Sequence, residues 1–503
     1  MTPGTANPAR AIPPQDPKRS QPCSTGRPTR MLLGEMAKRL AILCLIDGAR
    51  PDVLADLVAA GELPNIEREI LAGGTARTAV SCLPSTTGPA HLPFLTGCYP
   101  GTLNIPGIRW LDKVVFERGG IWDRGSFRSY NGIEAYLMDR DLPPERPTLF
   151  ELTERPFAIN SLITRGLPRG HNLTALARPL LYLYAHLTDR WHPIDRMAHR
   201  RLLACLDRDP DFVFAVYPAV DSYSHLRHPR HADTLAAYRA IDRGIGELVA
   251  ALKRRGRWDD TLLLITSDHG LTATDRHLDL ACHLNKRGMR TLFYPLVWKR
   301  RPEAAVMISG NAVGKIYFLR DGHPAAEPLD VRLRLGKVWD ELLGREEIDF
   351  LAWPAAPGRI EIAAARGKAA VTRGPEGFSY EPLEGDPFAL GALGPLTGDE
   401  ALVATAASEY PDALVQLDQF FASPRSGDLL VVARNGSDLR RAYEWPEHHS
   451  SHGSLQREHM TVPLLYNQTG WDPRPARTVD LFNTVLKWLG KPAVENVDGQ
   501  ALC

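Results

Sequence analysis

The sequence lacks a hydrophobic run long enough to cross a membrane. A membrane-spanning helix needs roughly 20 consecutive apolar residues, whereas the longest run near the N-terminus, residues 40–46, has only the length of a strand. Residues 1–30 contain no apolar segment like the core of a secretory signal. We therefore expect a soluble protein without a membrane span, and the cytoplasm is its default location.

Paired cysteines and an excess of either charge are missing as well. The seven cysteines are scattered along the chain without a Cys-x-x-Cys pair, which indicates neither a disulfide framework nor a thiolate metal site. The 60 basic and 59 acidic side chains leave a formal charge of +1. Net charge therefore gives no reason to expect nucleic acid or an anionic membrane as the main partner, and only local patches could attract either.

Short apolar runs with the length of buried strands are present instead. Four of them read "LAILCLID" from Leu40, "FVFAVYPAVD" ending at Asp221, "TLLLITSDHG" from Thr261, and "TVPLLYN" at residues 461–467. Between them, residues of about 202–206 and 232–254 carry apolar side chains at three- and four-residue spacing, which is typical of amphipathic helices. The order of strands and helices predicts an α/β fold, a mostly parallel sheet sandwiched by helices.

An acidic residue follows each of the first three apolar runs. Asp47, Asp221 and Asp268 lie at or just beyond the ends of the predicted strands, and ligands of open parallel sheets bind at that edge. A single aspartate there is more often a helix cap or a turn former. Three of them at one edge favour a shared binding site.

Histidines accompany these acids. Asp221 and His225 are four residues apart, which places both on one face of a helical turn, and Asp268 is followed by His269. Carboxylate and imidazole together are typical zinc ligands. Each pair alone is weak evidence in a chain with 16 histidines. A late segment, "EHHSSHGSLQREHMTVPLLYN", adds further histidines directly before a predicted strand, and one of them could complete a metal site.

Five motifs together resemble the metal-site motifs of the alkaline phosphatase superfamily, and most closely those of its type I phosphodiesterase/nucleotide pyrophosphatase branch. They are "LIDGARPDVL", "PSTTGPAHLPFLTGCYP", "DSYSH", "ITSDHG" and "SSHGSLQREHMTVPL", in this order, between about residues 40 and 470. The resemblance implies an alkaline phosphatase-like fold with two divalent metal ions, of which zinc is the first candidate. Asp47, Thr87, Asp268 and His269 would surround one ion, and Asp221, His225 and His452 would hold the other.

The resemblance also implies which hydroxyl attacks phosphorus. In the related sulfatases the nucleophile lies nine residues before the threonine of a Thr-Gly pair, and counting back from Thr96 gives Thr87. Ser85 and Thr86 are out of this register. The alternative is that these hydroxyls only cap the following helix. A sulfatase is disfavoured because Cys82 lies five residues too early for its signature and His91 occupies the place of the signature arginine.

The residues that would bind the substrate are less well defined. In the phosphodiesterase branch an asparagine some twenty residues after the nucleophile contacts the phosphoryl oxygen, and here Asn104 and Arg109 are both candidates in that region. An arginine would suit a dianionic monoester because its fork can bind two terminal oxygens. A structural or solvated role for Arg109 remains an alternative. Ala90 stands where many relatives carry asparagine, which weakens a specific nucleotide assignment.

The chain is longer than the sheet with its crossovers requires. Residues 1–36 have too little apolar content to fold, so we expect a disordered tail before one alkaline phosphatase-like catalytic domain at residues 37–503. We expect insertions at about residues 110–204 and 285–440. The second contains the strand-like segments "AVGKIYFL", "GRIEIAAARGKAAVTRG" and "GDLLVVARNG". This α+β cap would overhang the sheet edge and select the leaving group.

The sequence thus predicts a metal-dependent phosphoester hydrolase that acts on a small phosphate ester, most closely a phosphodiesterase of the nucleotide pyrophosphatase type. A phosphomonoesterase would share every metal ligand and would differ only in the phosphate clamp. A mutase is disfavoured because the mutases of the superfamily use serine. A non-catalytic binding protein would be expected to have lost ligands, and all seven are present. The oligomeric state is not set by the sequence.

Overall fold

The computed structural model describes residues 38–503 except 124, 299–300, 320–329 and 442–445. The chain divides into two units, Met1–Lys38 and Arg39–Cys503, and the description below concerns the second. The expected disordered tail at residues 1–36 lies outside the described residues. Within the described residues no helix combines the length and the apolar character that a bilayer crossing requires, and the six cysteines found there are free thiols.

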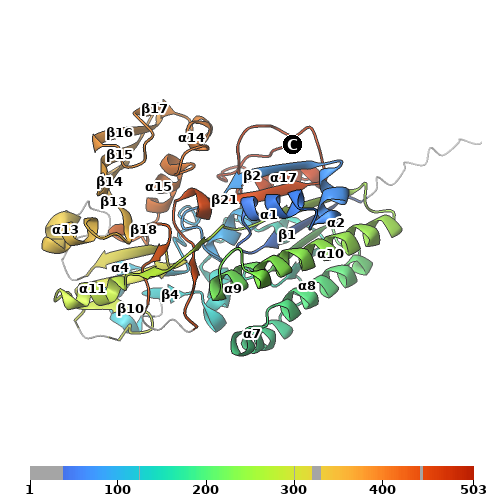
Figure 1. Ribbon diagram of the computed structural model, residues 1–503, viewed down its shortest axis with the longest axis horizontal. Helices are drawn as coiled ribbons and strands as arrows, with labels where there is room; N and C mark the ends of the chain where they lie inside the picture. The colour runs from blue at the N-terminus through green and yellow to red at the C-terminus, as the bar shows by residue number, and fades with distance from the viewer. Residues whose placement is uncertain (1–37, 124, 299–300, 320–329, 442–445) are drawn as a thin grey trace, which may run out of the picture. The chain divides into compact units, whose positions relative to one another are not determined.

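A seven-stranded sheet, here called the central sheet, is the core of this unit (Figure 1). All four apolar runs form strands in it, as predicted. The sheet is mostly parallel, because β1 pairs in parallel with both β6 and β7, and β5 pairs in parallel with β6. β21 is the exception, since it runs antiparallel to β2 and β7. The strand order is β22 (Ala476–Arg477), β2 (Thr75–Val80), β21 (Thr461–Tyr466), β7 (Thr261–Thr266), β1 (Leu40–Ile46), β6 (Phe212–Tyr217) and β5 (Pro156–Ile159).

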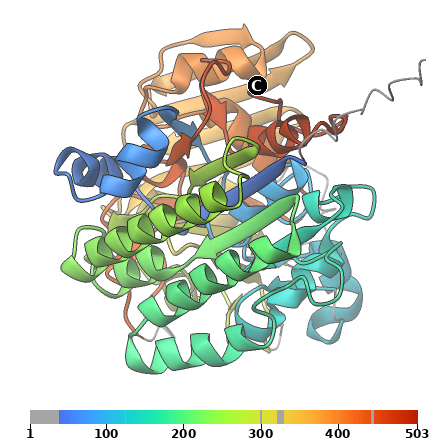
Figure 2. The same ribbon diagram turned by 90° about the vertical axis from the view of Figure 1, so that its right-hand side faces the viewer.

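Helices cover both faces of the central sheet, which explains why its inner strands β1, β6 and β7 are buried along their whole length. Alternate residues of β1 point to opposite faces: Ile42 packs with the first set of helices and Leu43 with the second. In Figure 2 the green helices of the first set run side by side across the sheet. The first set contains α1 (Pro51–Ala59), α8 (His192–Cys205), α9 (Ala219–Leu226) and α10 (Ala232–Arg254), and the second contains α3 (Leu92–Thr96), α6 (Leu149–Leu152) and α17 (Asp480–Trp488).

The two predicted helices are present, with different accuracy. α10 has the predicted bounds, because its apolar spacing runs unbroken between His231, whose side chain caps the first turn, and Arg255. α8 begins at His192, ten residues before the predicted segment. Its first turns carry Arg196, His199 and Arg200 on the solvent side. Because of these polar residues, the apolar spacing typical of a helix is not evident in this part of the sequence.

A second sheet of nine strands lies between residues 291 and 433. The three strand-like segments predicted there all form strands of this sheet. The sheet packs against α14 (Gly398–Thr405) and α15 (Ala413–Phe421) on one side and against α11 (Leu280–Lys286), α12 (Val331–Leu335) and α13 (Lys337–Leu343) on the other. The strand order is β10 (Thr291–Phe293), β11 (Ala304–Ser309), β12 (Val313–Phe318), β18 (Leu429–Ala433), β13 (Ile348–Ala356), β14 (Arg359–Ala364), β15 (Gly367–Gly374), β16 (Gly377–Gly385) and β17 (Leu393–Leu396).

The two expected insertions contribute to the fold in different ways. Every strand of the second sheet falls within the expected insertion at 285–440. The segment 110–204 instead contains β5, which is an edge strand of the central sheet. Where the catalytic domain ends and an insertion begins stays a prediction. The remaining elements include the strand pairs β3 (Arg109–Leu111) with β4 (Phe127–Ser129), β8 (Thr272–Ala273) with β20 (Ser450–Ser451) and β9 (Arg276–His277) with β19 (Ser437–Asp438), and the helices α2 (Pro64–Ile66), α4 (Lys113–Gly119), α5 (Leu137–Asp141), α7 (Ala177–Thr188) and α16 (Arg457–Met460).

A buried carboxyl under α9 makes the fold sensitive to pH. Asp195 of α8 accepts a hydrogen bond from the Ala219 amide at the start of α9 (3.3 Å), and its Oδ2 has no hydrogen-bond partner among the described residues. Burial raises the pKa of Asp195 from 3.8 to about 8, because the charged form is poorly solvated there. The folded protein therefore binds a proton that the unfolded chain releases above its own lower pKa.

This linkage predicts that stability falls as the pH rises. The contribution of Asp195 is complete below pH 3.8 and is lost as the pH approaches and passes about 8, with a slope of up to about 1.4 kcal/mol per pH unit in between. Asp195→Asn keeps the shape of the side chain and cannot ionise, so urea unfolding of this variant should depend less on pH than that of the parent. Identical pH profiles for the two proteins would contradict the assignment.

Candidate functional site

Three aspartates meet at the carboxyl ends of adjacent parallel strands. Asp47 follows β1, Asp221 lies in the first turn of α9 after β6, and Asp268 follows β7. Asp47 and Asp268 are buried. Gly48 permits the close approach of the first two: it has a φ of +70°, and a Cβ there would lie 2.8 Å from the Cβ of Asp221. The edge predicted from the sequence is therefore a real meeting point of acids.

Thr87 reaches the same edge from the turn between β2 and α3. Its hydroxyl lies 3.1 Å from Oδ1 of Asp47 and 2.9 Å from Nε2 of His269. Gly88, with a φ of +94°, turns the chain directly after it into the short 3-10 helix Pro89–His91. The neighbouring hydroxyls differ: Ser85 Oγ donates to the carbonyl of Ser454 (2.8 Å), and Thr86 is buried.

The three predicted histidines share one tautomer. Nδ1 lies against a backbone carbonyl in each: Ser450 for His225 (2.8 Å), Gly270 for His269 (3.1 Å) and Ser85 for His452 (2.9 Å). A carbonyl oxygen can only accept a hydrogen bond, so Nδ1 carries the hydrogen in all three rings. Nε2 therefore keeps its lone pair in each ring, which is the arrangement that a metal ligand needs.

The Nε2 lone pairs of the histidines and the carboxylate oxygens of the aspartates lie close together, with no hydrogen between them. Nε2 of His225 is 3.4 Å from Oδ1 of Asp221, an oxygen without a hydrogen bond among the described residues. Nε2 of His269 is 3.5 Å from both Oδ1 of Asp47 and Oδ2 of Asp268. Electron-rich atoms arranged in this way are stabilised by a cation, so the residues fit divalent metal ions.

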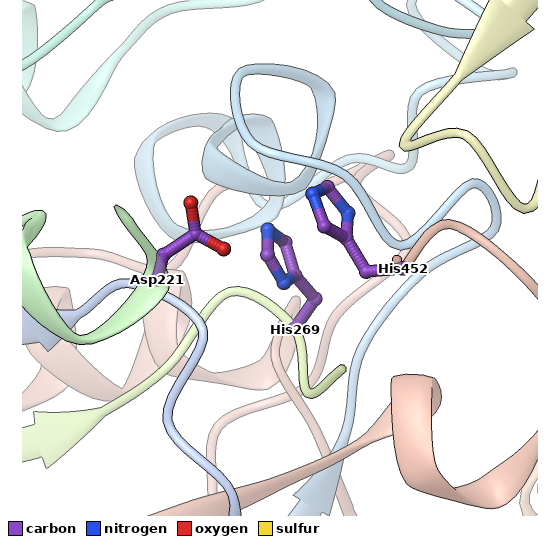
Figure 3. A group of neighbouring side chains, drawn as sticks. All are labelled: Asp221, His269 and His452. Carbon is purple, nitrogen blue, oxygen red and sulfur yellow. The ribbon is translucent and has the colours of Figure 1, made fainter. Parts of the chain in front are cut away.

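The structure groups the possible ligands in a slightly different way from the sequence. One group that could hold a metal ion contains Asp47, Asp268 and His269, and the other contains Asp221, His269 and His452. Figure 3 shows the Asp221 carboxylate pointing toward the ring of His269, with the ring of His452 on the far side. The rings of His269 and His452 are stacked, and their centroids are 3.8 Å apart. His269 therefore lies between the two groups. His225 is beside the second, with its ring 5.1 Å from that of His452.

The second sheet supplies the position of His452. The His452 amide donates to the carbonyl of Gly310 (2.9 Å), and the His452 carbonyl accepts from Ala312 (3.0 Å), both in the turn between β11 and β12. Because its Nδ1 also contacts Ser85, two residues before Thr87, this histidine joins the second sheet to the turn that carries the threonine. The site therefore needs both sheets.

The pKa values of the site reflect burial and the charges of the neighbouring acidic and imidazole side chains. Burial, and then the charges of Asp268 and Asp221, hold the pKa of Asp47 well above its ordinary value. Burial alone would raise the pKa of Asp268 too, but His269 and His91 keep it below its ordinary value. Burial and the neighbouring imidazoles lower the pKa of His452. Added positive charge would therefore stabilise the Asp47 carboxylate, and the His452 ring favours its neutral form.

One residue of the site was missed by the sequence reading. His91 is buried, and its Nε2 lies 3.2 Å from Oδ2 of Asp268. His91 thus reaches the Asp268 carboxylate from a position four residues after Thr87 in the chain. From the sequence alone, His91 serves only as an argument against a sulfatase. Its place in the first turn after the threonine motif was the available signal, because that turn has to face the same strand ends.

The two proposed substrate-binding residues have other contacts. Oδ1 of Asn104 accepts from Ser423 Oγ (2.6 Å). Arg109 is buried, donates to the carbonyl of Ile308 (3.3 Å) and lies over the ring of Tyr294. Both contacts tie the loop after α3 to the segments of the second sheet. A role of Asn104 or Arg109 in substrate binding stays a prediction.

Comparisons with known proteins agree on one family and one fold. The sequence model of the family described as "Type I phosphodiesterase / nucleotide pyrophosphatase" matches residues 41–455. No curated protein sequence matches the chain significantly. Among solved structures, a phosphonoacetate hydrolase from Sinorhizobium meliloti 1021 superposes with a TM-score of 0.54 at 16% identity, covering 90% of this chain and 96% of that one.

A second group of solved structures comes from mouse. Murine ectonucleotide pyrophosphatase/phosphodiesterase 5 superposes with a TM-score of 0.55 at 14% identity, covering 91% of this chain and 96% of that one. A further structure of the mouse protein, an inactive threonine-to-alanine variant in complex with AMP, has a TM-score of 0.54 at 14% identity. At such identities the superpositions establish a shared α/β fold.

Proposed function

The chain belongs to the type I phosphodiesterase/nucleotide pyrophosphatase family, and from this we propose that it hydrolyses phosphodiesters with Thr87 as nucleophile at a two-metal centre. Membership makes the protein a hydrolase of phosphoric ester bonds. The observation that carries the proposal is the position of the Thr87 hydroxyl, within 3.1 Å of Asp47 and 2.9 Å of His269 where the acids meet.

The residues around the hydroxyl divide into two proposed ligand sets. Asp47, Thr87, Asp268 and His269 would hold one divalent ion, and Asp221, His225 and His452 the other. The free Nε2 atoms and the repelling carboxylates support both sets. Zinc is the first candidate, because carboxylate and imidazole suit it. When bound, such ions lower the pKa of a coordinated hydroxyl or water and neutralise phosphoryl oxygens.

The reaction proceeds in two displacements. Thr87 Oγ1 forms a bond to phosphorus while the bond from phosphorus to the leaving oxygen breaks, and the leaving group departs as an alcohol with the proton that the threonine hydroxyl gives up. The hydrogen of the Thr87 hydroxyl is directed at Asp47 Oδ1 in the resting site. Water then attacks phosphorus from the opposite side, and the bond from phosphorus to Thr87 Oγ1 breaks. A proton of the water restores the threonine hydroxyl, and the product leaves as a phosphomonoester. His91 keeps the Asp268 carboxylate in place during both steps.

The relatives support this assignment without naming the substrate. The mouse structure described as inactive has one threonine replaced by alanine and contains AMP. This supports a role for that threonine in the reaction of the mouse protein, and a phosphate ester as its ligand. For this chain Ala90 and the contacts of Arg109 give no basis for a nucleotide. The proposal is therefore confined to phosphodiesters as a class.

The decisive measurement combines metal analysis with two simple esters. We expect the purified protein to contain two equivalents of a divalent metal, and to turn over bis-p-nitrophenyl phosphate at least about tenfold faster, in kcat/KM, than p-nitrophenyl phosphate. The reason is that Arg109, the candidate to bind a second terminal oxygen, contacts the Ile308 carbonyl and the Tyr294 ring. A preference for the monoester would show that the protein is a phosphomonoesterase and not a diesterase. Activity of the metal-free protein would refute the two-metal centre.

A further inference from the structure

Helix α7 leaves a row of leucines uncovered. Leu180 is 71% exposed and Leu187 is 68% exposed, and the spacing of the exposed residues by four, three and four positions places them on one side of the helix. In the described part of the chain twelve large apolar side chains are exposed, and α7 with the residue before it contributes five of them. These five, here called the leucine face, are Leu176, Leu180, Leu183, Tyr184 and Leu187.

The other side of α7 is packed, so the helix is held in place. Ala185 is buried in the core on the first face of the central sheet, and Leu181 and Tyr182 pack against the same core. The ring of Tyr182 meets that of Trp191 edge to face at 5.6 Å. Figure 1 shows α7 as the outermost of the three successive helices α10, α8 and α7. The leucine face is therefore an outer surface of a fixed helix, not an unfolded segment.

Arginines accompany the leucine face. Residues 177–205, which contain α7 and α8, include five arginines and no lysine or glutamate, and one of their two aspartates is the buried Asp195. The whole chain, by contrast, is balanced at 60 basic and 59 acidic residues. The basic residues are therefore concentrated on the same pair of helices as the exposed leucines. Four of the five arginines are exposed: Arg190, Arg196, Arg200 and Arg201.

We propose that the leucine face of α7, with the arginines of α7 and α8, docks the protein on an anionic lipid bilayer. An exposed apolar helix face beside arginines is the pattern of helices that lie in the bilayer interface, and anionic headgroups attract such arginines. α7 has 12 residues, a length of about 18 Å, too short to cross a hydrocarbon core of about 30 Å. It would lie on the membrane.

The charges argue against a second copy as the occupant. A symmetric pair of chains would place the same surface on both sides of the interface, so the arginines of both α7–α8 pairs would be brought to one interface. Like charges brought together in this way weaken association. An anionic bilayer offers the opposite charge and an apolar interior at once.

Docking through α7 would also hold the candidate site near the bilayer. The Trp191 amide donates to the hydroxyl of Tyr223 (3.0 Å), and Tyr223 lies in α9 between Asp221 and His225. Two contacts, Tyr182 with Trp191 and Trp191 with Tyr223, thus link α7 to the helix that carries two of the proposed ligands. The docking proposal does not depend on the proposed function, because lipid binding can be measured without turnover.

The test measures binding of the full-length protein to vesicles by co-sedimentation. One set of vesicles contains phosphatidylglycerol and phosphatidylcholine in equal parts, and the other contains phosphatidylcholine alone. We expect binding to the anionic vesicles that falls at least about tenfold in Leu180→Asp/Leu183→Asp. Arg196→Gln/Arg200→Gln should lose about tenfold on the anionic vesicles, with little change on the neutral ones.

Matched variants separate docking from damage to the fold. Leu333→Asp changes another exposed leucine, in α12, and should bind like the parent. All four proteins should hydrolyse a soluble phosphodiester equally. Binding that is absent, or unaltered by the α7 substitutions, would overturn the proposal. A dimer in sedimentation equilibrium that Leu180→Asp/Leu183→Asp dissociates would overturn it in favour of a second copy.

Discussion

Replacing Thr87 with alanine is expected to lower kcat/KM for a phosphodiester by at least about a thousandfold, because removal of an attacking group eliminates the covalent route. The side chain is part-buried, and its hydroxyl contacts Asp47 Oδ1 and His269 Nε2 in the site. The fold should therefore be unaffected. The measurement is steady-state turnover of bis-p-nitrophenyl phosphate, with metal content and thermal unfolding recorded on the same preparation.

Two neighbouring variants make the result specific. Thr87→Ser keeps a hydroxyl on the same carbon and should retain far more activity than Thr87→Ala. Thr86→Ala removes the adjacent hydroxyl, which is buried, and should cost less than about tenfold in kcat/KM. Full activity of Thr87→Ala, or an equal loss in Thr86→Ala, would leave these hydroxyls with the capping role that the sequence also allowed.

The features that could be predicted from the sequence are those with local signals. A strand buried on both faces is a continuous apolar run, and the residue after it lies at the edge of the sheet. β1, β6 and β7 with Asp47, Asp221 and Asp268 followed from that reasoning alone. The bounds of α10 followed from its uninterrupted spacing, whereas the start of α8 did not, because its first turns are polar on the solvent side.

The features that could not be predicted depend on contacts between distant segments. The tautomer of His452 is set by Ser85, 367 residues away, and the place of its backbone by the turn between β11 and β12. The contact of His91 with Asp268 likewise joins two residues that are far apart in the chain. The family resemblance supplied the ligand sets, but only the three-dimensional structure explains why Nε2 is the free nitrogen in each ring.

The expected loss on changing His452 follows from that free nitrogen. In His452→Asn the amide nitrogen can take the place of Nδ1 and keep the hydrogen bond to the Ser85 carbonyl (2.9 Å in the parent), while the Nε2 lone pair is deleted. We expect the variant to fold, to lose one of two metal equivalents, and to fall at least about a hundredfold in kcat/KM.

His452→Gln and His449→Ala are the matched controls for this prediction. Glutamine carries a polar atom near the position of Nε2 and should recover part of the metal content. His449 is exposed, and only its backbone amide contacts His225 (2.7 Å), so alanine at this position should leave both readouts unchanged. If His452→Asn kept two metal equivalents and parental turnover, His452 would be a bridge between the two sheets and not a ligand, and the second metal site would have to be sought among Asp221, His225 and their other neighbours.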